Sequence, residues 1–145
     1  MEISPKGVAL IKEFEGLRLD AYLCPAGILT VGYGHVVKIK DNIGLGQKIT
    51  QLRADLFLRD DLRWAEKCVV SLVNVRLNQN QFDALVSLAF NIGQTNFHRS
   101  TLLRVLNSSN YTAAANNFTR WVYAGKKKLP GLVRRREAER LLFVS

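Results

Sequence analysis

The chain has 145 residues, of which 48% are hydrophobic and 23% are charged. This composition predicts a folded domain with a sizeable core and excludes a disordered chain. Lysine and arginine number 21 against 12 acidic residues, so the formal net charge is +9. Such a balance indicates an anionic partner, but charge alone does not distinguish nucleic acid, an anionic lipid surface and an acidic polymer.

The chain has only two cysteines, Cys24 and Cys68, which are too few for a disulfide-stapled secreted scaffold. Cys68 is followed by two valines and is expected to be a buried thiol. No basic segment with a long apolar run opens the sequence, and no run approaches the roughly 18 apolar residues of a membrane-spanning helix. We therefore expect a protein made soluble in the cytoplasm, with no signal peptide and no stable membrane insertion.

The first predicted element is a helix. Ser4 and Pro5 are a typical N-cap and first helical residue. The apolar residues that follow at helical spacing are Val8, Ile11 and Phe14. Gly16 is expected to end this helix, which places Glu15 at its C-terminal end.

Residues 17–48 have the composition of a small β-rich lobe. Residues 24–27, Cys-Pro-Ala-Gly, are typical of a turn, and residues 28–31 have a strand composition. The glycines in residues 32–34 permit close approach of the backbone to another group. Further turn residues occur within 41–46, so the lobe is expected to be short-stranded.

The remainder of the sequence predicts helices. Thr50 is a candidate N-cap for a long helix reaching Val73, and Asn78 is a candidate N-cap for the next. The first carries Leu52, Leu56, Leu62 and Trp64, and the second carries Phe82, Leu85, Val86, Ala89 and Phe90. Because the second apolar face has no flanking charge, that helix is expected to be central. Shorter helices are expected over residues 99–107, 110–123 and 131–143.

Three ordered blocks carry a specific spacing: residues 13–22 with 30–35, residues 78–85 with 90–93, and residues 131–140. The first contains Glu15, Cys24 nine positions later and Thr30 six positions beyond that. This spacing resembles the catalytic signature of T4-type phage lysozymes, the endolysins of many tailed phages. The second block is similar to the central helix and following loop of that family. The third is similar to the C-terminal motif of its lambdoid members, especially those of P22-like phages.

The resemblance implies an α+β, predominantly helical, lysozyme-like fold. Residues 1–145 would form one lysozyme domain. A small β-hairpin lobe, about 17–48, would be inserted after the first helix, and residues 1–16 and 49–145 would form a larger all-helical lobe. The implied activity is hydrolysis of the β-1,4 bond between N-acetylmuramic acid and N-acetylglucosamine in peptidoglycan, by a monomer without metal or cofactor. The resemblance also implies release from the host cytoplasm to the periplasm through a phage holin.

Glycoside hydrolysis needs an acid for the leaving oxygen and a second group for the opposite face of the sugar. Glu15 is expected to be the acid, and Thr30 to hydrogen-bond the water or the substrate. Cys24 stands where many relatives have Asp; as a thiolate it could attack the anomeric carbon or activate water, and both courses stay open. By composition alone, all three residues also fit ordinary structural positions.

Other positions receive roles from the resemblance alone. The implied substrate-binding residues are Gly34, Val36, Phe90, Asn91 and Gly93. His35 is expected to be structural and to pair with Asp61. Among residues 134–136, Arg135 is expected to approach and orient Glu15. A single histidine without a second at ligand spacing argues against a metal site.

Three alternatives compete with a lysozyme. Lysines 126–128 and arginines 134–136 would suit a nucleic-acid-binding domain. A glycan-binding module without turnover would result if Cys24 were a disabling replacement. A lytic transglycosylase also uses one Glu, but it needs no second group. The spacing of Glu15, Cys24 and Thr30 favours the hydrolase and leaves nucleic acid without a role.

Overall fold

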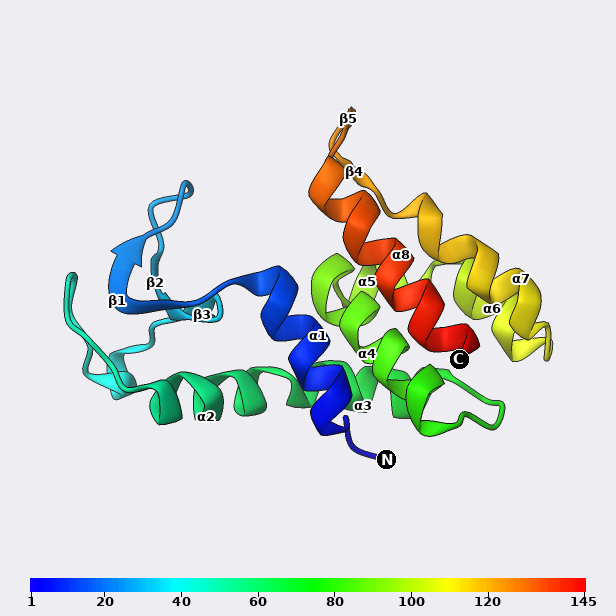
Figure 1. Ribbon diagram of the computed structural model, residues 1–145, viewed down its shortest axis with the longest axis horizontal. Helices are drawn as coiled ribbons and strands as arrows, with labels where there is room; N and C mark the ends of the chain where they lie inside the picture. Colours follow the sequence, from blue (N-terminus) through cyan, green and yellow to red (C-terminus); the bar gives the residue numbers. More distant parts are fainter. The chain divides into compact units, whose positions relative to one another are not determined.

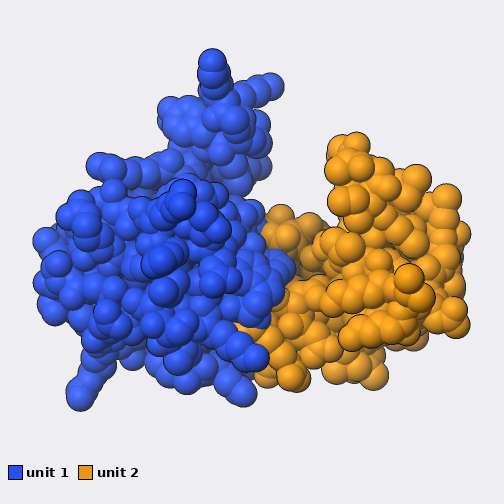
Figure 2. All heavy atoms as spheres, turned by 180° about the vertical axis from the view of Figure 1, so that it is seen from behind, with its two compact units in different colours: residues 1–11, 64–145 blue, residues 12–63 orange.

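The computed structural model describes residues 1–145, and the chain divides into two compact units. Unit 1 comprises residues 1–11 and 64–145, and unit 2 comprises residues 12–63 (Figure 2). Most of the chain is helical, with a small antiparallel sheet in unit 2, which confirms the predicted α+β class (Figure 1). None of the helices combines the length and apolar character needed to cross a membrane.

Unit 2 is a three-stranded sheet covered by a helix. Its elements are the end of α1 (Pro5–Glu15), β1 (Arg18–Leu23), β2 (Leu29–Gly32), β3 (His35–Val36), the 3-10 turn η1 (Ile39–Asp41) and α2 (Gln51–Asp61). The strands are antiparallel in the order β1-β2-β3, and α2 packs on β2 and β3. Val31, Ala54 and Leu58 are fully or almost fully buried there. The predicted β-rich lobe, residues 17–48, lies inside this unit.

Unit 1 is built around one buried helix. Its elements beyond α1 are α3 (Arg63–Leu72), α4 (Gln79–Ile92), α5 (Gln94–His98), α6 (Thr101–Asn107), α7 (Tyr111–Asn117), the 3-10 turn η2 (Phe118–Arg120), β4 (Tyr123–Ala124), β5 (Lys127–Lys128) and α8 (Pro130–Val144). Helix α4 is buried at every position from Phe82 to Ala89 and packs on α8. The prediction that this helix is central to its lobe is confirmed.

The predicted helix starts follow from local capping. The Asn78 side chain accepts from the Gln81 N–H at 2.8 Å, and the Gln81 side chain accepts from the Asn78 N–H at 2.9 Å. This reciprocal pair is a capping box. Thr50 likewise accepts from the Arg53 N–H at 3.1 Å, which starts α2.

The single long helix predicted from Thr50 to Val73 is wrong, because α2 and α3 are separate helices. The break lies at Leu62, whose N–H bonds to the carbonyls of both Leu58 and Asp60. The backbone there keeps φ −74° and ψ −16°, so the interruption is a local tightening of the turn. No glycine or proline marks it in the sequence.

The side chains of α2 also differ from a simple apolar stripe. Leu52 and Leu56 are exposed, whereas Ala54 and Leu58 form the buried face. Sheet packing on α2 therefore selects the smaller of the available apolar faces.

The helix predicted over residues 110–123 is also too long. Helix α7 ends at Asn117, and after η2 the chain enters the two-stranded hairpin β4–β5. The lobe predicted to be all-helical thus contains a hairpin. Two-residue strands are too short to show the alternation that identifies a strand in a sequence. Residues 131–143 lie within α8 as expected, and residues 99–107 reduce to α6, capped by Ser100.

Candidate active site

Glu15 is the last residue of α1, and Gly16 ends the helix with φ +73°. The half-buried Glu15 carboxylate lies beside Gly34, in the turn between β2 and β3. A Cβ built on Gly34 would be 3.7 Å from Oε1 of Glu15. Gly34 has φ +82°, a conformation that residues with a side chain rarely adopt. A glycine here both forms the turn and leaves space beside the carboxylate.

Cys24 opens the tight turn between β1 and β2. Its carbonyl accepts from the Gly27 N–H at 2.8 Å, and its own N–H donates to the Ile28 carbonyl at 3.0 Å. Backbone hydrogen bonds from Ile28 and Ala26 lower the pKa of the thiol, with a smaller contribution from the Thr30 side chain and some opposition from burial. The turn therefore favours a thiolate at Cys24.

Thr30 lies in the middle strand and is buried. It pairs with Tyr22 of β1 on one side and with Val36 of β3 on the other, so these three residues form a row across the sheet. Paired residues project from the same face. The Thr30 hydroxyl donates to the Ile28 carbonyl at 2.9 Å, which leaves its oxygen free to accept another proton.

A polar network holds the end of α1 beside the sheet. Lys12, one turn before Glu15, forms an ion pair of 2.9 Å with Asp55 of α2 and lies 5.3 Å from the ring centroid of Tyr33. Gln51 donates to both the Tyr33 hydroxyl and the Asp55 carboxylate, at 3.0 and 2.9 Å. Hydrogen bonds from Lys12 and Gln51 lower the pKa of Asp55. The network fixes the helical turn that carries Glu15.

Comparison with known proteins decides the family. A family model described as Phage lysozyme matches residues 12–139. The chain belongs to the phage lysozyme family. It is a glycoside hydrolase of the lysozyme type, as the sequence resemblance predicted.

The relatives of this phage lysozyme match it over its whole length. It is 48% identical to the endolysin of Salmonella phage P22 over 146 residues, which cover 100% of this chain and 99% of that protein. The structure of a P22 lysozyme mutant is similar with a TM-score of 0.93 and 47% identity, covering 100% and 99% of the two chains. The muramidase domain of SpmX from Asticaccaulis excentricus has a TM-score of 0.90 and 42% identity, covering 99% and 98%. The lysozyme-like fold is thereby confirmed.

The phage lysozyme holds His35 between two carboxylates. Its Nδ1 atom lies 2.8 Å from Asp61 and its Nε2 atom 2.9 Å from Asp41. The imidazole stacks on Phe57 with centroids 3.9 Å apart and planes 5° apart. Although burial opposes ionisation, hydrogen bonds from His35 and the Lys38 N–H lower the pKa of Asp41. These contacts join β3, η1 and α2, and they occupy both ring nitrogens of His35.

Three of the expected substrate-binding residues belong to unit 1 of the lysozyme. Phe90 is half-buried near the end of α4, where its ring lies 6.0 Å from that of Trp64. Asn91 is exposed, and Gly93 ends the helix with φ +90°. Gly34 and Val36 belong to unit 2 and are both exposed. Substrate binding at these five positions stays a prediction.

The arginine run of α8 divides by burial. Arg134 is exposed, whereas Arg135 and Arg136 are buried beside Glu139, at 3.3 and 2.6 Å. Glu139 also accepts from the Ser87 hydroxyl of α4. The expected orientation of Glu15 by Arg135 stays a prediction, since these contacts lie within unit 1.

Cys68 is buried in α3, as predicted, and burial raises the pKa of its thiol. Both cysteines of the lysozyme are free thiols. No three or more His, Cys, Asp or Glu side chains are grouped to hold a metal ion. Sequence reasoning missed Asp41 and the pair of Lys12 with Asp55. Asp41 was marked only by a turn signal, and the Lys12 pair joins residues 43 positions apart.

Proposed function

We propose that Glu15 protonates the glycosidic oxygen between N-acetylmuramic acid and N-acetylglucosamine in peptidoglycan. The bond between C1 of the muramic sugar and the O4 oxygen of the glucosamine breaks. The electron pair leaves with that oxygen, which takes the Glu15 proton. Positive charge then develops at C1 and is neutralised from the opposite face of the sugar.

Cys24 and Thr30 serve that opposite face. As a thiolate, Cys24 either bonds to C1 and is later displaced by water, or takes a proton from the water that attacks C1. The first course retains the anomeric configuration and the second inverts it. In both, the oxygen of water ends on C1, and Thr30 accepts a hydrogen bond from that water or from the sugar.

The observation that supports this proposal is the turn at Cys24. Two backbone hydrogen bonds lower the pKa of a thiol at the position where many relatives carry a carboxylate. A group that is more readily ionised at this position can do chemistry that an ordinary thiol performs poorly at neutral pH. Glu15 and Thr30 belong to the same compact unit.

The cellular role follows the family. We propose that the lysozyme is a monomer that stays in the host cytoplasm until a phage holin opens the inner membrane, and that it then degrades peptidoglycan from the periplasm. Phe90, Asn91 and Gly93 are proposed to contact the glycan together with Gly34 and Val36. No metal or cofactor takes part in the proposed reaction.

The first test is mass analysis of fragments released from purified Gram-negative peptidoglycan. The wild-type chain should release fragments ending in a hydrated, reducible muramic acid, and Glu15→Gln should release none. Glu13→Gln, two positions away on the same helix and exposed, is the matched control and should keep activity. Anhydro ends would identify a transglycosylase, and wall binding without any fragments would identify a binding module.

The second test addresses Cys24. Cys24→Ser should lower turnover at least tenfold, because a hydroxyl is far less readily ionised than a thiol, whereas Cys24→Asp should restore much of it. Full activity of Cys24→Ser would remove the thiol from the mechanism. NMR of the first-formed anomer then decides between the nucleophile and the base: a β product indicates the covalent course, and an α product indicates activation of water.

A further inference from the structure

The net charge of the chain is confined to one segment. Residues 84–136 contain nine of the 21 lysines and arginines and none of the 12 acidic residues, so they carry a net charge of +9. The other residues carry twelve basic and twelve acidic side chains and are neutral overall. Since Arg135 and Arg136 are buried beside Glu139, seven of the nine cations are exposed. An anionic partner is therefore expected to meet unit 1 at this segment.

Three of these seven cations lie on the β4–β5 hairpin, which projects from the surface of unit 1 (Figure 2). Its two-residue loop begins at Gly125, with φ +62°, which suits the tight turn of a short hairpin. Lys126, Lys127 and Lys128 are all exposed, and the ion pairs of the structure engage other residues. The hairpin therefore presents cations whose charge no neighbouring carboxylate neutralises.

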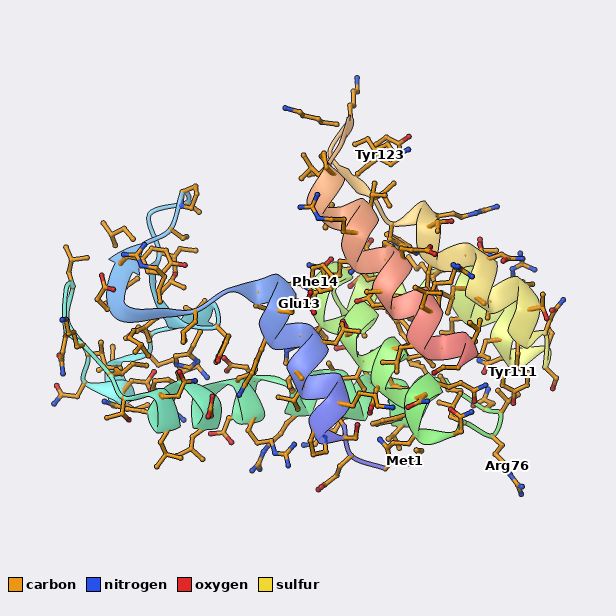
Figure 3. All side chains as sticks on the ribbon, viewed as in Figure 1. Met1, Glu13, Phe14, Arg76, Tyr111 and Tyr123 are labelled. Atoms are coloured by element: carbon orange, nitrogen blue, oxygen red, sulfur yellow. The ribbon has the colours of Figure 1, made fainter.

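The base of the hairpin borders a cavity within unit 1. The cavity has a volume of about 260 Å³ and is lined by Asn91, Ile92, Asn96, Trp121, Tyr123 and Leu132. Tyr123, the first residue of β4, stands at the base of the hairpin in Figure 3. Amide groups combined with aromatic and aliphatic side chains suit an N-acetylated sugar, which has an amide and apolar ring faces.

The register of the hairpin separates its lysines. Tyr123 pairs with Lys128, and Ala124 pairs with Lys127. Paired residues project from the same face, and successive residues project from opposite faces. Lys128 therefore shares the face of Tyr123, which lines the cavity, and Lys127 projects from the other face.

We propose that Lys128 binds a carboxylate of the peptide attached to the muramic sugar while the adjacent cavity holds a sugar of the same strand. This inference rests on the proposed function and adds a part of the substrate to it. The peptide stems of peptidoglycan carry free carboxylates and branch from the glycan, so a cation beside a sugar cavity meets them. The hairpin then distinguishes a wall strand with acidic stems from a neutral N-acetylated glycan.

The test compares Lys128→Gln with Lys127→Gln, its matched control on the same hairpin. Both remove one exposed positive charge, and both should leave the unfolding temperature unchanged. The substrates are soluble peptidoglycan oligomers of one length with acidic stems, and the same oligomers with the stem carboxylates converted to amides. The quantity measured is kcat/KM for each variant on each substrate, at low and at high salt.

On the acidic oligomers, Lys128→Gln should lower kcat/KM about fivefold at low salt, mainly through KM, and Lys127→Gln less than about twofold. On the amidated oligomers neither variant should differ from the wild type, and high salt should close the gap on the acidic ones. Equal effects of the two variants, or an equal loss on amidated stems, would overturn the role of Lys128. Failure of the wild type to cleave either oligomer would overturn the proposed function and this inference together.

Discussion

The Nε2 atom of His35 lies 2.9 Å from Oδ2 of Asp41, on the side of the imidazole opposite Asp61. Asp41 also accepts from the Lys38 N–H at 2.8 Å, so its carboxylate closes the 3-10 turn η1 and attaches it to β3. The arrangement stabilises the part of unit 2 that follows the Gly34 turn. It gives the His35 ring a fixed orientation rather than a free nitrogen for catalysis.

Asp41→Asn should lower the free energy of unfolding by about 2 kcal/mol at neutral pH, because hydrogen bonds to a buried charged group are lost. Since the folded state lowers the pKa of Asp41 below its ordinary 3.8, the carboxylate stabilises the fold fully above that value. The stabilisation disappears as the pH falls below 3.8 through the folded-state pKa. Urea unfolding from pH 7 to pH 3 should show the difference between wild type and variant narrowing.

Asp20→Asn is the matched control for this measurement. Its pKa is also lowered, by a hydrogen bond from Arg18, but the pair is about half exposed. Screening by solvent makes such a pair a weak contributor, so the variant should unfold like the wild type. A pH-independent difference for Asp41→Asn would show that the stabilisation is not electrostatic.

The two thiols should differ in alkylation. Backbone hydrogen bonds lower the pKa of Cys24, while burial raises that of Cys68. Iodoacetamide at pH 7 should therefore modify one thiol quickly, with a rate that reaches half its maximum below pH 9.0, the ordinary thiol value. Mass analysis of peptides should locate the label on Cys24, and activity should fall with it. Rapid labelling of the Cys24→Ser variant would contradict this assignment.

Much of the helical part could be predicted because helix starts depend on nearby residues. Asn78 and Thr50 form capping bonds three residues along the chain, and such bonds are visible as a sequence pattern. The break at Leu62 and the hairpin after Trp121 could not be predicted in this way. The first carries no glycine or proline, and the second has strands of only two residues.

The candidate site shows the same division. Glu15, Cys24 and Thr30 could be proposed because their spacing resembles a family, and the three fall in one compact unit. The contacts that position them could not be proposed. Lys12 meets Asp55 across 43 residues, and packing of α2 on the sheet decides that contact.

Gly34→Ala should lower both stability and activity. Its φ of +82° strains a residue with a side chain by about 1 kcal/mol, and the new Cβ would lie 3.7 Å from Oε1 of Glu15. Any relaxation of the turn then moves the backbone beside the proposed acid. Gly46→Ala is the control, because Gly46 has φ +80° with nothing within 4 Å. It should lose similar stability in thermal unfolding and retain kcat; equal losses of kcat would separate the Gly34 turn from catalysis.

Glu139→Gln should be the most destabilising of these changes. Glu139 is fully buried between Arg135 and Arg136, and removing its charge leaves two buried guanidinium groups without their carboxylate. Loss of one member of a buried charged group costs about 3–5 kcal/mol. Glu137→Gln, two positions away on α8, breaks only a partly exposed pair with Arg140 and should leave the unfolding temperature nearly unchanged. Urea unfolding of both variants measures the contrast. Equal midpoints would mean that the buried arginines are solvated or re-paired without Glu139, and that α8 does not depend on this cluster to pack on α4.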